Sequence, residues 1–220
     1  MLAARPAAIV FAAAPAEPTA RLRARLAALE KPYIVAADRG AATALAFGYR
    51  PDLVIGDLDS VEAATLTELR RLGTPIEVHP RDKDATDGQL AVARALDVRP
   101  SQLVLLGFLG GTRLDQALAN VLLLVGLGLP AVLLDAHNEC LLVRSGTEHT
   151  WRTEPAEVVS LLPLNGDVEG VHTRGLRWPL IGDQLRLGDT RGVSNEPAAD
   201  EASVSITGGL LLVTRHFPTQ

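Results

Sequence analysis

Residues 103–134 read LVLLGFLGGTRLDQALANVLLLVGLGLPAVLL and indicate the fold class most clearly. Leu103 to Phe108 is a short apolar run, typical of a buried strand. A glycine-rich turn follows, and Leu114 to Leu127 has the length and the Ala/Leu content of a helix. Glycines and Pro130 then separate this helix from a second apolar run, Val132 to Leu134. Strand, helix and strand in this order predict two parallel strands joined by a helix.

The same alternation extends back to the start of the chain. Further strands are expected at 8–11, 33–37, 53–55 and 76–79, and helices at 19–30, 41–47, 63–72 and 87–96. Repeated alternation of this kind predicts an α/β fold with a doubly wound, mainly parallel sheet.

The pattern changes at about Cys140, where the helical period ends. Short apolar runs at 158–162, 185–187, 202–206 and 210–214 are separated there by Gly, Pro, Asn and Asp. They predict an antiparallel β-sandwich. We therefore expect an α/β domain over residues 1–140 and a sandwich domain over 141–220, with the transition near Ser145 to Thr150.

Composition narrows the class of protein. The chain has 220 residues, 47% of them hydrophobic, and Cys140 is its only cysteine, so it should fold without an intrachain disulfide. Met1 to Ala14 fits a buried strand better than a signal peptide, and glycines interrupt the apolar stretch Leu118 to Leu134, so we expect a cytoplasmic protein without a membrane segment. The net charge is −5 and the 21 Lys and Arg residues are scattered, which argues against nucleic-acid binding.

Ligands of an open parallel sheet bind beyond the carboxyl ends of its strands. The loop Gly56 to Ser60 follows an apolar strand and holds Asp57 and Asp59. In extended backbone, carboxylates at i and i+2 point to the same side and can share one hard cation. The alternative is a turn in which Asp and Ser cap the next helix.

Two further loops carry suitable groups for a phosphate ligand. Arg81 to Asp87 combines acidic residues with Lys83 at the approach to a helix, although an ordinary cap by Thr86 explains it equally well. Gly107 to Gln116 combines paired glycines with Arg113, a side chain suited to phosphate oxygens. Together the three loops contain the residue types that phosphoryl transfer needs.

Five motifs in order resemble those of the thiamine pyrophosphokinase family. They are DRGA at 38–41, PDLVIGDLDS at 51–60, KDATD at 83–87, GGTRLDQ at 110–116 with Ala119 and Asn120, and GVSNE at 192–196. The resemblance implies a homodimer that transfers the diphosphate of ATP to the hydroxyl of thiamine and releases AMP, with Mg²⁺ as the metal ion.

The resemblance also implies roles for single residues. It makes Asp57, Asp59 and Asp87 the metal ligands, and it makes these three residues catalytic together with Arg113 and Asp115. Around the nucleotide it places Asp38, Lys83, Gly110, Gly111 and Arg113. In the second domain it assigns thiamine contacts to Ser194 and Asn195, and Trp178 is a candidate stacking surface for an aromatic cation.

Some positions depart from the family pattern. Arg39 stands where a glycine or small residue is usual, Ala12 to Ala14 replaces a glycine-containing turn, Thr112 adds a residue before Arg113, and Gln116 replaces a common His. Three other functions stay open: a pyrophosphokinase for a pterin-like alcohol, a non-catalytic thiamine- or nucleotide-binding module, and a phosphatase with Asp57 as nucleophile.

Overall fold

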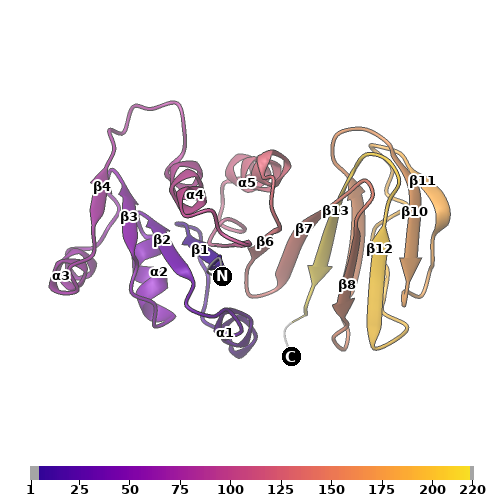
Figure 1. Cartoon of the computed structure of the whole chain (residues 1–220), viewed down its shortest axis with the longest axis horizontal. Helices are drawn as coiled ribbons and strands as arrows, with labels where there is room; N and C mark the ends of the chain where they lie inside the picture. The colour runs from indigo at the N-terminus through magenta and orange to yellow at the C-terminus, as the bar shows by residue number, and fades with distance from the viewer. Residues whose placement is uncertain (1–4, 219–220) are drawn as a thin grey trace. The chain divides into compact units, whose positions relative to one another are not determined.

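The computed structural model describes residues 5–218, and the chain forms two compact units that divide between Ala136 and His137. The sequence-based division lay after residue 140. The first unit contains helices and strands, and the second unit contains strands (Figure 1).

The first unit contains a parallel sheet of six strands. They are β1 (Ala8–Phe11), β2 (Tyr33–Ala37), β3 (Leu53–Gly56), β4 (Ile76–Val78), β5 (Leu103–Leu106) and β6 (Ala131–Leu134), in the order β4-β3-β2-β1-β5-β6. All their pairings are parallel. The predicted doubly wound α/β fold is therefore confirmed.

Helices cover both faces of this sheet (Figure 1). They are α1 (Ala20–Ala27), α2 (Gly40–Ala46), α3 (Ala63–Arg71), α4 (Asp87–Asp97) and α5 (Leu114–Gly126). Residues of α1, α2 and α3 share one apolar cluster with β1 and β2, whereas α4 packs on the opposite face and contacts β1, β2 and β3. Thr19 and Thr86 cap α1 and α4, each accepting a hydrogen bond from a backbone N–H of the first turn.

The strand order reverses between β1 and β5. From β1 the chain moves outward through β2, β3 and β4, and then crosses to β5 on the other side of β1. Loops that leave two such neighbouring strands diverge and open a crevice, the usual ligand position in this fold. Gly107 allows the close approach there: its φ is 73°, and a Cβ would lie 2.3 Å from the carbonyl oxygen of Ala12.

The second unit consists of two antiparallel sheets, which confirms the predicted sandwich class. One sheet has the order β7 (Asn138–Arg144), β13 (Leu210–His216), β9 (Val158–Pro163). The other has the order β11 (Ile181–Leu185), β10 (Val168–Arg174), β12 (Glu201–Ser205), β8 (Glu148–Arg152). The strands β7, β8 and β10 were not among those expected. The strands β8 and β10 alternate polar and apolar residues and show no apolar run, whereas β7 does contain one, at 140–143, where the predicted domain boundary lay.

The run 185–187 was placed too late in the chain, since β11 ends at Leu185. Leu187 lies beyond that strand and is 56% exposed. No helix within residues 5–218 has both the length and the apolar character needed to cross a membrane.

A buried ion pair lies inside the second unit. Arg215 donates to both carboxylate oxygens of Glu157, at 2.6 and 3.0 Å, and its guanidinium lies 5.5 Å from the ring centroid of Trp151. Glu157 also accepts from the indole N–H of Trp151 at 3.1 Å and from the backbone N–H of Glu154. Because these groups satisfy one another, the charges are accommodated away from water.

Candidate active site

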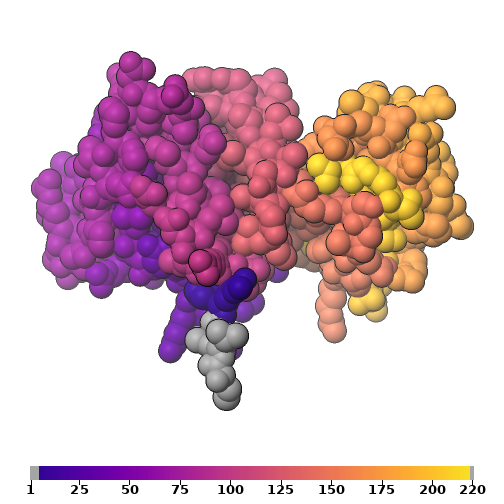
Figure 2. Space-filling model, turned by 45° about the horizontal axis from the view of Figure 1, so that its top comes forward, coloured from indigo at the N-terminus to yellow at the C-terminus, as the bar shows by residue number. Residues whose placement is uncertain are grey.

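A cavity of about 690 Å³ lies at the carboxyl-terminal edge of the parallel sheet. The loops after β1, β2, β4 and β5 and residue Asp57 after β3 line it, together with the first turns of α4 and α5. Figure 2 turns this edge of the first unit toward the viewer. Five of its lining residues are acidic and four are basic: Asp38, Asp57, Asp84, Asp87 and Asp115, and Arg39, Arg81, Lys83 and Arg113.

Asp38 directly follows β2 and is held in a left-handed conformation with φ 45°. Its Oδ1 accepts the backbone N–H of Leu58 at 3.2 Å, so the loop after β2 is tied to the loop after β3. Gly56 makes room for this contact, because a Cβ at that position would lie 1.8 Å from Asp38 Oδ1. The pairing of β2 with β3 thus brings Asp38 beside the aspartate loop.

Carboxylates crowd around Asp38. Burial, above all, together with the charges of Asp87 and Asp57, raises the pKa of Asp38 to about 6, against the opposing effect of the hydrogen bond from Leu58. Asp87 is the charged neighbour with the largest effect on the pKa of Asp38. Such a cluster repels itself unless a proton or a cation neutralises part of its charge.

The loop with Asp57 and Asp59 is a turn rather than extended backbone, so the expected geometry of two parallel carboxylates was wrong. Leu58, between them, has φ 62°, and the backbone N–H of Asp59 donates to Asp57 Oδ1 at 3.1 Å. That hydrogen bond is the main cause that lowers the pKa of Asp57, and Lys83 and Arg81 also lower it. Asp57 lines the cavity, whereas Asp59 is exposed and is not among the lining residues.

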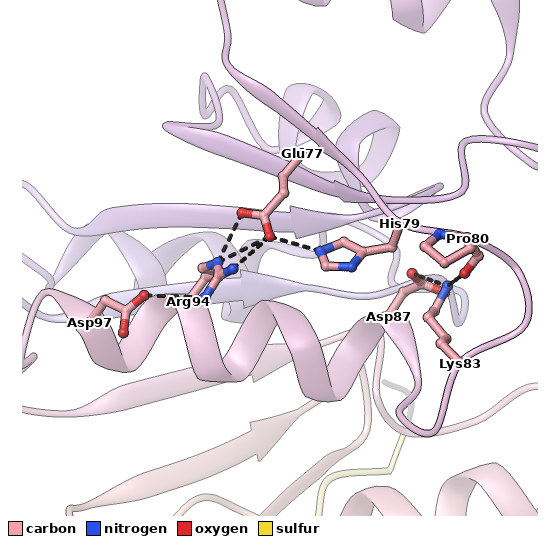
Figure 3. Close-up of polar contacts among 7 residues, drawn as sticks. All are labelled: Glu77, His79, Pro80, Lys83, Asp87, Arg94 and Asp97. Carbon is pink, nitrogen blue, oxygen red and sulfur yellow. Dashed lines mark hydrogen bonds and ion pairs between the residues drawn. The ribbon is translucent and has the colours of Figure 1, made fainter.

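The loop between β4 and α4 brings Lys83 next to Asp87. Lys83 Nζ lies 2.9 Å from Asp87 Oδ1 and donates to the carbonyl oxygen of Pro80 at 3.0 Å (Figure 3). Thr86 caps the helix that Asp87 begins, so the ordinary cap and the charged cluster are present together. Thr86, Asp87 and Gly88 at the start of α4 line the cavity together with Lys83.

A second cluster of polar residues, which the sequence did not indicate, connects the two ends of this loop. Glu77 on β4 accepts hydrogen bonds of 2.7 and 2.8 Å from Arg94 on α4, and His79 Nε2 lies 2.8 Å from Glu77 Oε1 (Figure 3). The contacts join the strand before the loop to the helix after it. Glu77 and Arg94 are 17 positions apart in the sequence, so no local pattern indicates the pair.

Glycines and an ion pair form the loop after β5. Gly110 and Gly111 have φ values of 80° and 77°, which glycine adopts without strain. Arg113 forms two hydrogen bonds with Asp115, Nε to Oδ1 at 2.8 Å and Nη2 to Oδ2 at 2.5 Å. The hydrogen bonds from Arg113 lower the pKa of Asp115 to about 2. Asn120 on α5 donates to the carbonyl oxygen of Phe108 at 2.8 Å and so fixes the start of this loop, a contact that the motif alone did not reveal.

The second unit brings the three predicted thiamine-binding residues together. The oxygen and the nitrogen of the Asn195 carboxamide both bind the backbone of Trp178. Oδ1 accepts a hydrogen bond from the Trp178 N–H at 3.1 Å, and Nδ2 donates to the Trp178 carbonyl oxygen at 2.7 Å. Ser194 has φ 62°, and its N–H donates to Ser160 Oγ at 3.0 Å. Trp178 is 52% exposed, and the guanidinium of Arg177 lies 4.8 Å from its ring centroid. Asn195, itself buried, therefore holds the segment that presents the indole.

Within residues 5–218, no three Asp, Glu, His or Cys side chains lie close enough to enclose a metal ion on their own. The carboxylates of Asp38, Asp57 and Asp87 are nevertheless near neighbours whose oxygens suit a hard cation. Mg²⁺ commonly binds through one or two carboxylates and completes its shell with waters and substrate phosphates. The cavity therefore fits a cation that arrives with a phosphorylated ligand.

Two family models match separate parts of the chain. The catalytic domain of thiamin pyrophosphokinase matches residues 25–130, and the vitamin B1 binding domain of thiamin pyrophosphokinase matches residues 148–211.

Relatives and solved structures agree with these matches. The chain is 28% identical over 184 residues to thiamine pyrophosphokinase of Bacillus subtilis, covering 82% of this chain and 86% of the relative. The crystal structure of the Bacillus subtilis thiamine pyrophosphokinase superimposes with a TM-score of 0.86 at 24% identity, covering 97% of this chain and 100% of that one. The thiamin pyrophosphokinase from Geobacillus thermodenitrificans gives 0.82 at 27% identity, covering 97% and 99%.

Proposed function

Because the chain belongs to the thiamine pyrophosphokinase family, we propose that it transfers the diphosphate group of ATP to the hydroxyl of thiamine, forming thiamine diphosphate and AMP. One observation carries the proposal: a single cavity at the switch point of the sheet gathers carboxylates, a lysine, an arginine and a glycine turn from separate loops. Positioning and electrostatic stabilisation provide most of the catalysis in such transfers.

Asp57 and Asp87 are the proposed Mg²⁺ ligands, with Asp38 beside them. The ion would neutralise negative charge on the phosphate oxygens of ATP. The cavity needs such a cation because it has one more acidic than basic lining residue and would otherwise repel a nucleotide. Asp59, whose exposed side chain lies outside the cavity lining, remains a predicted third ligand.

The remaining groups hold the phosphates and the reacting oxygen. Lys83 keeps one N–H free beyond its contacts with Asp87 and Pro80, and that donor can bind a phosphate oxygen. Gly110 and Gly111 let the backbone approach the nucleotide, and Asp115 orients the Arg113 guanidinium. An aspartate of the cluster is the proposed acceptor of the thiamine hydroxyl proton.

The second unit is the proposed thiamine-binding part. Trp178 offers an exposed indole on which an aromatic cation can stack, and Ser194 lies next to the residue that fixes it. We assign Asn195 to orienting Trp178, because its carboxamide already binds that backbone. The proposed active form is a cytoplasmic homodimer.

Product analysis tests the proposal. The purified protein is incubated with ATP and Mg²⁺ and with thiamine or a pterin-like alcohol, and the products are separated and identified. We expect thiamine diphosphate and AMP in equal amounts and no product from the pterin. ADP, inorganic phosphate or a stable phosphoaspartate in place of these products would favour a kinase or the phosphatase alternative, and binding without turnover would favour a non-catalytic module.

A further inference from the structure

The four basic residues of the cavity differ in how far their charges are already engaged. Lys83 contacts Asp87, and Arg113 forms two hydrogen bonds with Asp115. By contrast, within residues 5–218 the side chains of Arg39 and Arg81 form no ion pair or hydrogen bond, although both line the cavity and are exposed. Two guanidinium groups therefore face the cavity with all their donors available.

The topology puts these two arginines on opposite sides of the aspartate loop. Arg39 follows β2, Arg81 follows β4, and β3 lies between those strands in the sheet. Asp57 directly follows β3 and lines the same cavity. A ligand held at Asp57 is thus flanked by a guanidinium on either side.

The charges show what kind of ligand this arrangement suits. When Lys83 and Asp87, and Arg113 and Asp115, neutralise each other, the cavity is left with Asp38, Asp57 and Asp84 against Arg39 and Arg81. A cation at the carboxylates can hold only some oxygens of a triphosphate. Guanidinium groups bind the other oxygens well, because their planar forks match phosphate in two-point contacts.

We infer that Arg39 and Arg81 are phosphate-binding residues that clamp the triphosphate of the nucleotide from both sides of Asp57. The inference rests on the proposed function and extends it to two residues to which the motif resemblance assigns no role. Arg39 directly follows Asp38 within the DRGA motif, and Arg81 lies two residues before the KDATD motif, so both belong to loops that carry motif residues.

Equilibrium binding tests the clamp separately from catalysis. Wild type and the variants Arg39→Gln, Arg81→Gln, Arg39→Lys and Arg81→Lys are titrated with a non-hydrolysable ATP analogue and Mg²⁺, with inorganic tripolyphosphate and Mg²⁺, and with AMP. Arg70→Gln is the matched control, because Arg70 is an exposed arginine of the same unit that does not line the cavity and has no side-chain partner among the described residues. Thermal unfolding verifies that each variant is folded.

We expect each glutamine variant to bind the ATP analogue and tripolyphosphate with an affinity about tenfold lower than that of wild type. This is the loss typical of removing one charged hydrogen-bonding group. The lysine variants should recover part of that loss, AMP binding should stay unchanged, and Arg70→Gln should match wild type. In turnover, the KM for ATP should rise while kcat stays nearly constant, as for contacts made equally in ground and transition states.

Triphosphate binding within twofold of wild type in either glutamine variant would overturn the two-sided clamp. An equal loss for AMP would overturn it too, because the arginines would then act on the nucleoside end or on the fold. If wild type forms no thiamine diphosphate but the glutamine variants lose triphosphate binding, only the proposed function fails. If wild type forms thiamine diphosphate and the variants bind normally, only the clamp fails.

Discussion

At the scale of single residues, the acidic cavity is explained by which carboxylates face one another. Asp38 follows β2, Asp87 begins α4 after the loop that leaves β4, and Asp57 follows β3, which lies between β2 and β4 in the sheet. Burial and these neighbouring charges raise the pKa of Asp38 to about 6. A cluster of this kind is costly in the free protein and favourable once a cation is bound.

Replacement of Asp57 by Asn should abolish turnover and leave the fold intact. The change removes an anionic ligand, while it also relieves repulsion with Asp38, so unfolding free energy should stay within about 0.5 kcal/mol of wild type or rise slightly. Steady-state assays over a range of Mg²⁺ concentrations and thermal unfolding measure the two effects. Near-normal activity would refute the assignment of Asp57 to the metal.

The same replacement at Asp59 tests a residue whose side chain is exposed outside the cavity lining. If Asp59 joins the metal when substrate binds, Asp59→Asn should lose activity as fully as Asp57→Asn. Retained activity would show that the turn needs only the Asp59 backbone N–H, which donates to Asp57.

At the scale of elements, glycines decide how closely the loops at the switch point approach. Gly107 and Gly110 both have positive φ values, 73° and 80°. Only Gly107 is also crowded, since a Cβ there would lie 2.3 Å from the Ala12 carbonyl oxygen and nothing lies within 4 Å of one at Gly110. The two positions separate backbone conformation from steric contact.

Gly110→Ala should destabilise the protein by about 1 kcal/mol, the usual cost of a left-handed alanine. Gly107→Ala should cost about 1–3 kcal/mol more, because β1 and β5 must separate to accept the methyl group. Urea denaturation of both variants provides the comparison. Equal losses of unfolding free energy in the two variants would mean that the loop after β1 can move away from residue 107 without cost.

The ion pair of Glu77 and Arg94, which links β4 to α4, makes the free energy of unfolding depend on pH. Hydrogen bonds from Arg94, with a further contribution from His79, lower the pKa of Glu77 to about 2 from the ordinary 4.5. Because the folded-state pKa is the lower one, this stabilisation is complete above pH 4.5 and is lost as the pH falls toward 2.

Glu77→Gln should therefore destabilise the protein near pH 7 by about 1–2 kcal/mol, a value reduced for the partial exposure of the pair. The difference from wild type should narrow below pH 4.5. Urea denaturation at pH 7, 5, 4 and 3 measures it. A difference that is constant over this range would show that the charge of Glu77 has no part in the link.

At the scale of the whole molecule, phosphate-handling residues and proposed thiamine-binding residues belong to different units. Asp57 lies in the first unit and Asn195 in the second. The resemblance to the family implies a homodimer in which one pocket combines the first domain of one subunit with the second domain of its partner.

Mixing inactive Asp57→Asn chains with inactive Asn195→Ala chains should restore activity if the pocket is shared between subunits. Each mixed dimer then retains one pocket with both residues intact, so activity should reach at most about a quarter of the wild-type level under random exchange. Exchange is verified by native mass spectrometry or by differently tagged chains. Verified exchange without recovered activity would mean that each pocket lies within a single chain.

Much of this molecule could be predicted from local sequence. The apolar runs at 8–11 and 33–37 became β1 and β2 without a change in bounds, and Thr86 caps α4 as its position before Asp87 suggested. These features depend on residues that are close in the sequence, because a local apolar run indicates a buried strand and a nearby side chain caps the unpaired N–H groups at the start of a helix. By the same reasoning, the ends of the strands indicated which loops would carry the cavity residues.

Contacts between distant segments could not be predicted in this way. Local sequence does not determine that Glu77 binds Arg94 or that Asn195 holds Trp178. Nor does it determine that Lys83 and Arg113 are paired while, among the residues that the structure describes, Arg39 and Arg81 have no ion pair. The extended geometry expected for Asp57 and Asp59 failed for the same reason, because Asp38, from another strand, binds the Leu58 N–H and stabilises a turn.

Short-range patterning sets the class of each unit, the order of the strands along the chain and the positions of the reactive side chains at strand ends, so these could be predicted from local sequence. Which strands are neighbours, which charges neutralise one another and which two arginines have no ion pair within residues 5–218 follow from the folded structure. Those outcomes depend on the register and order of strands in the sheet, which bring together groups that are far apart in the chain.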